Sequence, residues 1–177
     1  TLKSKDIDGE NDGQVLLDVD DFIEGGNDRH RRIFEQFYEK YNCGKTVVVM
    51  ETEGEGTLFA GRRVRQLRNY YFTIDMNEYV EAKLHPIEVP RGYISSTTEI
   101  TEDMLLKIKG VNGGLGWLAS TGRPDTAAIH SILPSQYADM KPSLVSDGNS
   151  AVKQCRENPI TIKIWSIPPK DIRWAAF

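Results

Sequence analysis

The sequence predicts an α+β fold in which most strands precede most helices. The chain has 177 residues, and 39% of them are hydrophobic, which is enough to form a core. Strand-like runs dominate before residue 84, whereas segments with helical spacing and capping residues dominate from residue 101 to residue 158. Strands grouped apart from helices are typical of the α+β class.

Apolar or β-branched runs bounded by turn-forming residues predict the strands of the first half. The expected strands are residues 14–17, 22–23, 46–51, 57–66 and 70–74. The first two enclose the acidic sequence Asp18-Val19-Asp20-Asp21, so we expect a hairpin with acids at its tip. One helix is expected after this hairpin, from Asn27 or Asp28 to about Tyr41, because aromatic residues recur there at helical spacing.

The helices expected after residue 75 begin near residues that can cap them. They are residues 76–84 capped by Asp75, residues 101 to 109 or 120, residues 126–137 capped by Asp125, and residues 147–156 capped by Ser146-Asp147. Four glycines between residues 110 and 116 make it less favourable for the helix that begins at residue 101 to continue to residue 120. Residues 160–167 alternate as a strand, and a further strand is expected to begin at residue 172.

These elements divide the chain into five expected parts. They are a disordered or turn-rich lead at 1–13, a strand-rich part at 14–84, a linker at 85–100, a helical part at 101–158 and a terminal strand region at 159–177. The linker is assigned from its proline and glycine content.

Composition and charge exclude several classes of protein. No apolar stretch approaches the roughly 20 residues of a membrane helix, and the polar start is unlike a signal peptide. Cys43 and Cys155 lie too far apart for a disulfide framework or a zinc cluster, so we expect an intracellular protein, cytoplasmic or nuclear. Residues 1–60 carry 14 acidic and 7 basic side chains, and the remainder carries 12 and 15, a split that suits polyanion contacts in the second part.

The acidic sequence at the expected hairpin tip is the sharpest candidate site. Crowded carboxylates repel one another unless a cation neutralises them, and oxygen ligands suit a divalent hard cation. Two such ions can stabilise the charge of phosphoryl transfer. Successive strand residues face opposite ways, so Asp20 and Asp21 are not expected to face one ion equally. The alternative is an acidic turn that only meets solvent.

A calcium-binding loop is a second interpretation of the first residues. Asp8, Glu10, Asp12 and Gly13 match the first positions of a calcium-loop pattern. Its twelfth position is Val19 instead of the glutamate that would bind calcium through both oxygens.

A basic run with aromatic neighbours is the candidate nucleic-acid contact. Arg62, Arg63, Arg65 and Arg68 lie close to aromatic residues at 59 and 70–72, and arginine pairs with phosphate while aromatic rings stack on bases. The alternative is a half-buried strand with a solvated face. The three tryptophans, at positions 117, 165 and 174, are expected in the core.

Several sequence blocks occur together, in order, in the copia-type reverse transcriptases of LTR retrotransposons. The segment VLLDVDDFIEGG resembles their Y-V-D-D hairpin, and LFAG is similar to their F-L-G segment. The segment YFTIDMNEYVEAKL is similar to their I-x-L-x-Q-x-x-Y-I-x-x-L segment, and GGLGWLASTGRPDT resembles their W-L-A and R-P-D block. The last residues resemble the strand that enters their RNase H domain. The similarity extends over about residues 14–177.

This resemblance implies the final part of a polymerase palm, then a mostly helical thumb and the entry strand of the connection and RNase H region. It implies that Asp20 and Asp21 are the catalytic, Mg²⁺-binding pair and that Phe59 and Gly61 are primer-grip positions. Arg123-Pro124-Asp125 is expected to be structural, with the proline ending one helix and the aspartate capping the next. The implied partners are an RNA or DNA primer–template and, in the full-length family, a deoxynucleoside triphosphate.

Three departures from the family pattern bear on activity. Asp18 replaces the tyrosine of the hairpin motif, and Gly122 replaces a threonine. The family's other metal-binding aspartate lies upstream of the hairpin and has no counterpart in this sequence. We therefore expect a fragment of an RNA-directed DNA polymerase that is inactive alone and needs the missing polymerase portions or another subunit. A non-catalytic remnant that binds nucleic acid and a calcium-binding protein are the alternatives.

Overall fold

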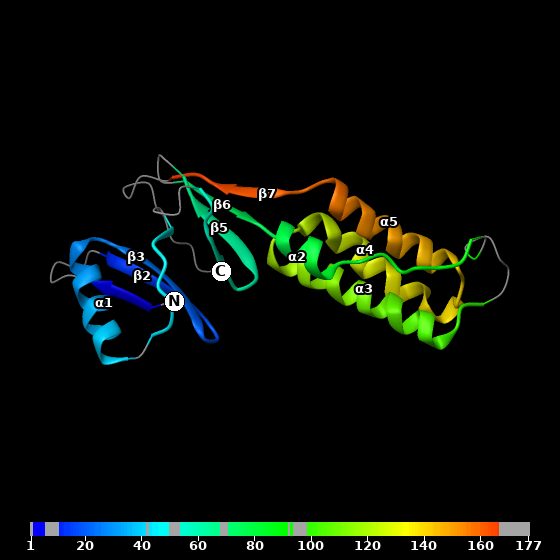
Figure 1. Cartoon of the computed structure of the whole chain (residues 1–177), viewed down its shortest axis with the longest axis horizontal. Coiled ribbons are helices and arrows are strands. Elements are labelled where there is room, and N and C mark those ends of the chain that lie inside the picture. Colours follow the sequence, from blue (N-terminus) through cyan, green and yellow to red (C-terminus); the bar gives the residue numbers. More distant parts are fainter. Residues whose placement is uncertain are drawn as a thin grey trace.

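The computed structural model describes residues 2–5, 11–41, 43–49, 54–67, 71–91, 93 and 99–166. These residues form two antiparallel sheets at one end of an elongated molecule and a group of helices at the other (Figure 1). The α+β class predicted from the sequence is confirmed. No helix in the described part of the chain combines the length and the apolar character that crossing a bilayer requires.

The first sheet has three strands in the order β1-β2-β3, with bounds Leu2–Lys5, Asn11–Asp18 and Asp21–Gly26. The hairpin of β2 and β3 was predicted from the sequence. The expected lead at 1–13 is wrong in part, because β1 and the start of β2 lie within it. Strand pairing uses backbone groups, so the polar side chains of this lead do not prevent a ladder.

Helix α1 (Asp28–Lys40) packs on one face of this sheet. Asn27, one of the two caps that the sequence allowed, accepts hydrogen bonds from the backbone N–H groups of Arg29 and His30. The buried His30 ring occupies the space beside Gly13 and Gly26, where any added Cβ would lie within 2.3 to 2.6 Å of the ring. These two glycines therefore allow the helix to approach the sheet closely.

The second sheet has the order β4-β5-β6-β7, with bounds Thr57–Phe59, Arg62–Gln66, Phe72–Asp75 and Thr161–Ile164. The expected single strand at 57–66 is instead two strands, because Ala60 and Gly61 have φ angles of 50° and 74° and form a two-residue turn. The last strand, β7, returns from the helical region to pair with β6 (Figure 1).

The strand expected at 46–51 is also wrong for the described residues 46–48. They have no regular structure, and Val48 is exposed. Residues 46–48 belong to neither of the two sheets. β-branched residues favour a strand only where a neighbouring strand packs beside them. The strand expected from residue 172 lies outside the described residues.

The helical region contains α2 (Asn77–Lys83), α3 (Glu102–Thr121), α4 (Ala127–Ile132) and α5 (Ser143–Glu157). Short 3-10 helices, η2 (Pro124–Thr126) and η3 (Leu133–Asp139), join α3 to α4 and extend α4. Helix α3 takes the longer of the two expected lengths in spite of its glycines. Packing explains this length, because Leu115 and Leu118 lie on its fully buried face.

Two expected caps are wrong. Asp125 lies within η2 and makes no capping hydrogen bond to α4; its carboxylate binds Arg123 instead. Helix α5 begins at Ser143, after Pro142, so Ser146 and Asp147 lie in its interior. Proline has a φ angle suited to a helix start, which the sequence prediction did not use.

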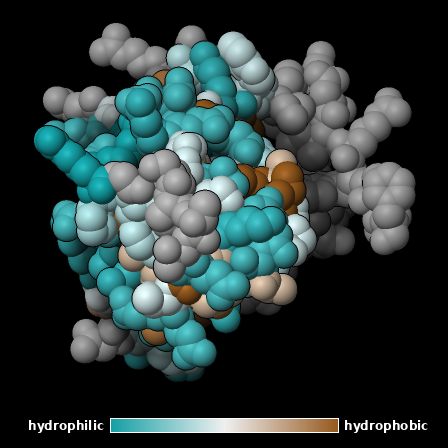
Figure 2. Space-filling model, turned by 90° about the vertical axis from the view of Figure 1, so that its right-hand side faces the viewer, coloured by the Kyte–Doolittle hydropathy of each residue, from teal (hydrophilic) through white to brown (hydrophobic). Residues whose placement is uncertain are grey.

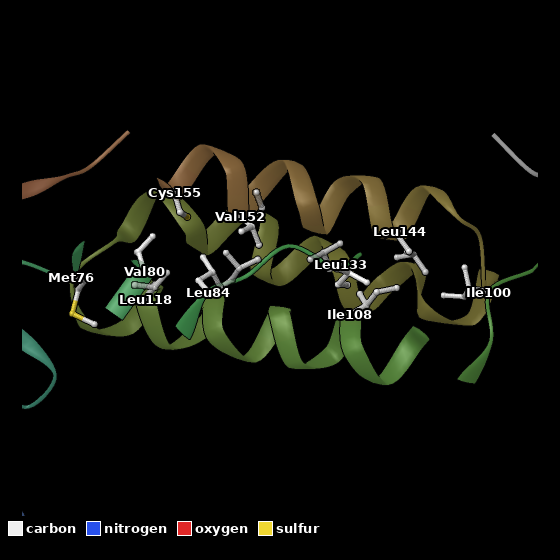
Figure 3. Close-up of a cluster of buried hydrophobic side chains, with 14 residues drawn as sticks. Met76, Val80, Leu84, Ile100, Ile108, Leu118, Leu133, Leu144, Val152 and Cys155 are labelled. Atoms are coloured by element: carbon white, nitrogen blue, oxygen red, sulfur yellow. The ribbon is translucent and has the colours of Figure 1, made fainter. Parts of the chain in front are cut away.

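One hydrophobic cluster fills the space between these helices (Figure 3). Its buried members are Met76, Val80, Leu84, Ile87, Ile100, Ile108, Leu115, Leu118, Leu133, Leu144, Val145, Ala151, Val152 and Cys155. The extended segment after α2 is held against α5, because the Asn149 side chain both accepts from Ile87 N and donates to Ile87 O. The end of the molecule formed by the helices is covered mainly by hydrophilic residues (Figure 2).

Candidate nucleic-acid interface

The tip of the first hairpin presents three acidic residues to solvent. Asp18 and Asp21 are the last paired residues, and Val19 and Asp20 form the two-residue turn between them. Asp18, Asp20 and Asp21 are all exposed. Like charges directly opposite each other weaken a strand pair, so the acids at this tip reduce the stability of the hairpin.

The turn at this tip is also strained. Val19 has a φ angle of 51° and is 87% exposed. A β-branched residue rarely adopts this left-handed conformation, which costs about 1–3 kcal/mol. An exposed apolar side chain gains little from burial, so local packing does not account for its presence here. Strain of this kind is typical of functional sites.

The hairpin acids alone do not fit a complete magnesium site. Among the residues that the structure describes, no three histidine, cysteine, aspartate or glutamate side chains are placed to share a metal ion. The assignment of Asp20 and Asp21 as a Mg²⁺-binding pair stays a prediction.

The residues of the calcium-loop interpretation lie partly in a strand. Asp12 and Gly13 belong to β2. Gly13 pairs with both neighbouring strands, whereas Asp12 lies at an irregularity in the pairing with β1 and is 5% exposed. The Asp12 carboxylate accepts a hydrogen bond of 3.0 Å from Asn27 Nδ2 at the start of α1. Asp8 and Glu10 lie outside the described residues. The described half of this pattern therefore joins the sheet to α1.

The predicted primer-grip residues lie at the end of β4 and in the β4–β5 turn, which lies against the end of α3. Phe59 is 7% exposed and points into the protein, whereas Gly61 is in the turn itself. A Cβ on Gly61 would be 3.8 Å from the Trp117 ring, so the turn lies beside this indole. Trp117 is 45% exposed. The expectation that Trp117 belongs to the core is therefore wrong, as is that for Trp165, which is 66% exposed.

Three arginines of the predicted basic run bind other residues of the protein. Arg62 Nε donates a 2.7 Å hydrogen bond to Thr121 O at the end of α3. Arg63 pairs with Glu78 on α2, and Arg65 pairs with the buried carboxylate of Asp75. Arg68 lies outside the described residues. These partners do not follow from the local sequence, and the prediction that the three arginines contact nucleic acid stays untested.

The Arg123-Pro124-Asp125 segment forms a corner after α3 in which Arg123 is buried, whereas Pro124 and Asp125 are exposed. Arg123 is completely buried, and its Nε and Nη2 donate to the Asp125 carboxylate at 2.9 and 2.8 Å. Its Nη1 donates to Cys155 O near the end of α5. The hydrogen bonds from Arg123 lower the pKa of Asp125 below its usual value. This corner joins two helices, which fits a structural role.

Sequence reasoning missed two features of this candidate interface. The strained turn at Val19 depends on a backbone angle, which composition does not reveal. Trp117 follows four glycines in α3, and the open positions Gly110 and Gly113 lie two turns and one turn before it, respectively. That spacing places Trp117 on the same open face and could have predicted its exposure.

Comparison with known proteins returns no match to this chain among family models, curated proteins or solved structures.

Proposed function

We propose that this chain is a part of a copia-type reverse transcriptase that comprises the end of the palm and the thumb. Its role within that enzyme is to contact the primer–template duplex beside the site of nucleotide addition. The observation that carries the proposal is the strained two-residue turn at Val19, which holds Asp20 and Asp21 in solvent at the end of a hairpin. Three clustered acids and a strained valine both destabilise the hairpin, which favours a functional reason for this combination.

The order of elements supports the same proposal. The acidic hairpin is followed by a helix on its own sheet, then by a glycine turn at β4–β5 and then by the helical region. This is the order that the resemblance implies for palm, primer grip and thumb. The half-exposed Trp117 beside Gly61 adds an aromatic surface on which a base or sugar can stack.

Nucleotide addition in this class of enzyme uses two Mg²⁺ ions that stabilise the charge of phosphoryl transfer. The described residues supply an incomplete ligand set, so we assign no catalytic step to this chain alone. The isolated chain is expected to bind an RNA–DNA duplex without extending the primer.

Fluorescence anisotropy with a labelled RNA–DNA primer–template tests this proposal. The affinity should fall steeply between about 50 and 200 mM salt, because binding to phosphates releases counterions. Trp117→Ala should weaken binding by about tenfold, within the usual range for one stacked base. Trp165→Ala is the matched control, because it removes another exposed indole and should leave the affinity unchanged.

Two outcomes contradict the proposal. One is the absence of duplex binding at low salt, and the other is an equal loss of affinity in both tryptophan variants. A primer-extension assay with Mg²⁺ completes the test, since measurable extension by the isolated chain would show that its metal site is complete.

A further inference from the structure

The carboxyl end of α3 receives its positive charge from the second sheet. The last carbonyl groups of a helix lack partners within the helix and attract cations. Helix α3 has no basic residue in its own last turn. Arg62 supplies one from 59 positions earlier in the chain, through the 2.7 Å hydrogen bond from its Nε to Thr121 O.

The same end of α3 contacts the β4–β5 turn a second time. Gly61, which directly precedes Arg62, lies against the Trp117 ring one turn before Thr121. The turn–helix junction, defined here as Ala60, Gly61 and Arg62 with Trp117 and Thr121, is therefore held by the hydrogen bond between Arg62 and Thr121, with Gly61 beside the Trp117 ring.

Neighbouring contacts make this junction the place where β5 meets two helices. Arg63 binds Glu78 on α2, and a Cβ on Gly122 would lie 3.0 Å from Met76, just before α2. Met76 is only 1% exposed. We therefore expect the β4–β5 turn to move together with α3, because β5 is bonded to α3 through Arg62 and to α2 through Arg63.

We propose that Arg62 is a positioning residue that fixes the β4–β5 turn on the end of α3 instead of binding a phosphate. The proposal rests on the proposed function, since the turn is placed there for contact with the primer–template. Arg62 is only partly buried, and it follows the turn directly, so an interpretation as a phosphate contact is natural from sequence. Its Nε, however, is already bonded to Thr121 O.

The variants Arg62→Gln and Arg62→Lys separate the two roles, with Arg31→Gln as the matched control. Arg31 is an exposed arginine on α1, remote in sequence from the junction. The first readout needs no nucleic acid: it is the indole N–H NMR signal of Trp117, together with amide exchange at Gly122. The second readout is the affinity for an RNA–DNA duplex at several salt concentrations.

We expect Arg62→Gln to shift the Trp117 signal and speed exchange at Gly122. The same substitution should weaken duplex binding by about tenfold, because the β4–β5 turn loses the Arg62–Thr121 hydrogen bond that holds it on α3. The slope of log affinity against log salt should not change, because no phosphate contact is lost. Arg62→Lys keeps the charge beside Thr121 O and should lie between wild type and Arg62→Gln. Arg31→Gln should leave the Trp117 signal unchanged.

A phosphate contact would give the opposite pattern, with the salt slope reduced by about 0.9 for each lost contact and the Trp117 signal unmoved. That result overturns the proposal, as does a moved signal with unchanged affinity. If the wild-type chain binds no duplex, the proposed function fails. The Trp117 signal then still decides whether Arg62 fixes the turn on α3.

Discussion

The helical region and the first sheet differ in how completely each buries its own apolar side chains. All fourteen buried members of the hydrophobic cluster lie between Met76 and Cys155, and several are fully buried. Among the side chains of residues 12–40, which cover most of β2 and all of β3 and α1, Val15 is the one buried hydrophobic side chain. Large hydrophobic side chains are exposed there at Leu16, Leu17, Val19, Ile33, Phe37 and Tyr41.

Within the described residues, the helical region therefore has its own hydrophobic core, whereas the first sheet and α1 leave large hydrophobic side chains exposed. A contiguous exposed apolar surface is uncommon on an isolated domain. The aromatic residues that do pack there, such as Phe22 against Phe34 and Tyr38, are only half-buried. A palm fragment separated from its other strands would show such a surface, which agrees with the proposed function.

The largest expected effect comes from truncating one leucine in each region. Leu118→Ala removes a side chain that is 0% exposed and should lower the free energy of unfolding by about 3–5 kcal/mol. Leu17→Ala removes a side chain that is 63% exposed and should change it by about 0.5 kcal/mol or less. Urea unfolding followed by circular dichroism measures both. Equal losses in the two variants would contradict the contrast between the regions.

A smaller effect is expected where Asp125 pairs with the buried Arg123 in the helical region. Asp125→Asn removes the charge that Arg123 faces, and about 3 kcal/mol should be lost because the guanidinium stays buried without a full partner. Asp139→Asn is the control, since its pair with Lys141 is exposed and worth about 0.5 kcal/mol or less.

The pH dependence of this variant sharpens the test. The pKa of Asp125 is lowered in the folded state by the hydrogen bonds from Arg123. Its ionised form therefore adds stability above about pH 4, and this contribution disappears as the pH falls through the folded-state pKa. The difference between wild type and Asp125→Asn should shrink in acid, and a difference that grows there would contradict the assignment.

The elements that the sequence predicted correctly are those fixed by local signals. The hairpin follows from two apolar runs around an acidic centre, and the start of α1 follows from Asn27 as a cap. The division of 57–66 into two strands depends on the positive φ angles of Ala60 and Gly61. A run of strand-forming residues gives no sign of that turn beyond a single glycine.

The candidate site was harder to predict, because its important contacts join distant residues. Asp20 and Asp21 were proposed as site residues because they lie in an acidic run between two apolar runs and because this run resembles the Y-V-D-D hairpin. The partners of Arg62 and Arg63 lie 59 and 15 positions away and become neighbours only when β5 packs against the helices. A basic run therefore indicates charge but does not indicate whether protein or nucleic acid neutralises it.

Amide hydrogen exchange, followed by mass spectrometry on the isolated full chain, tests the contrast between the two regions most directly. We expect slow exchange in α3 and α5 and much faster exchange in β2, β3 and α1, because apolar packing protects the first set and is incomplete in the second. Equally slow exchange in both sets would contradict the account, since the hairpin sheet would then be as complete a unit as the helices.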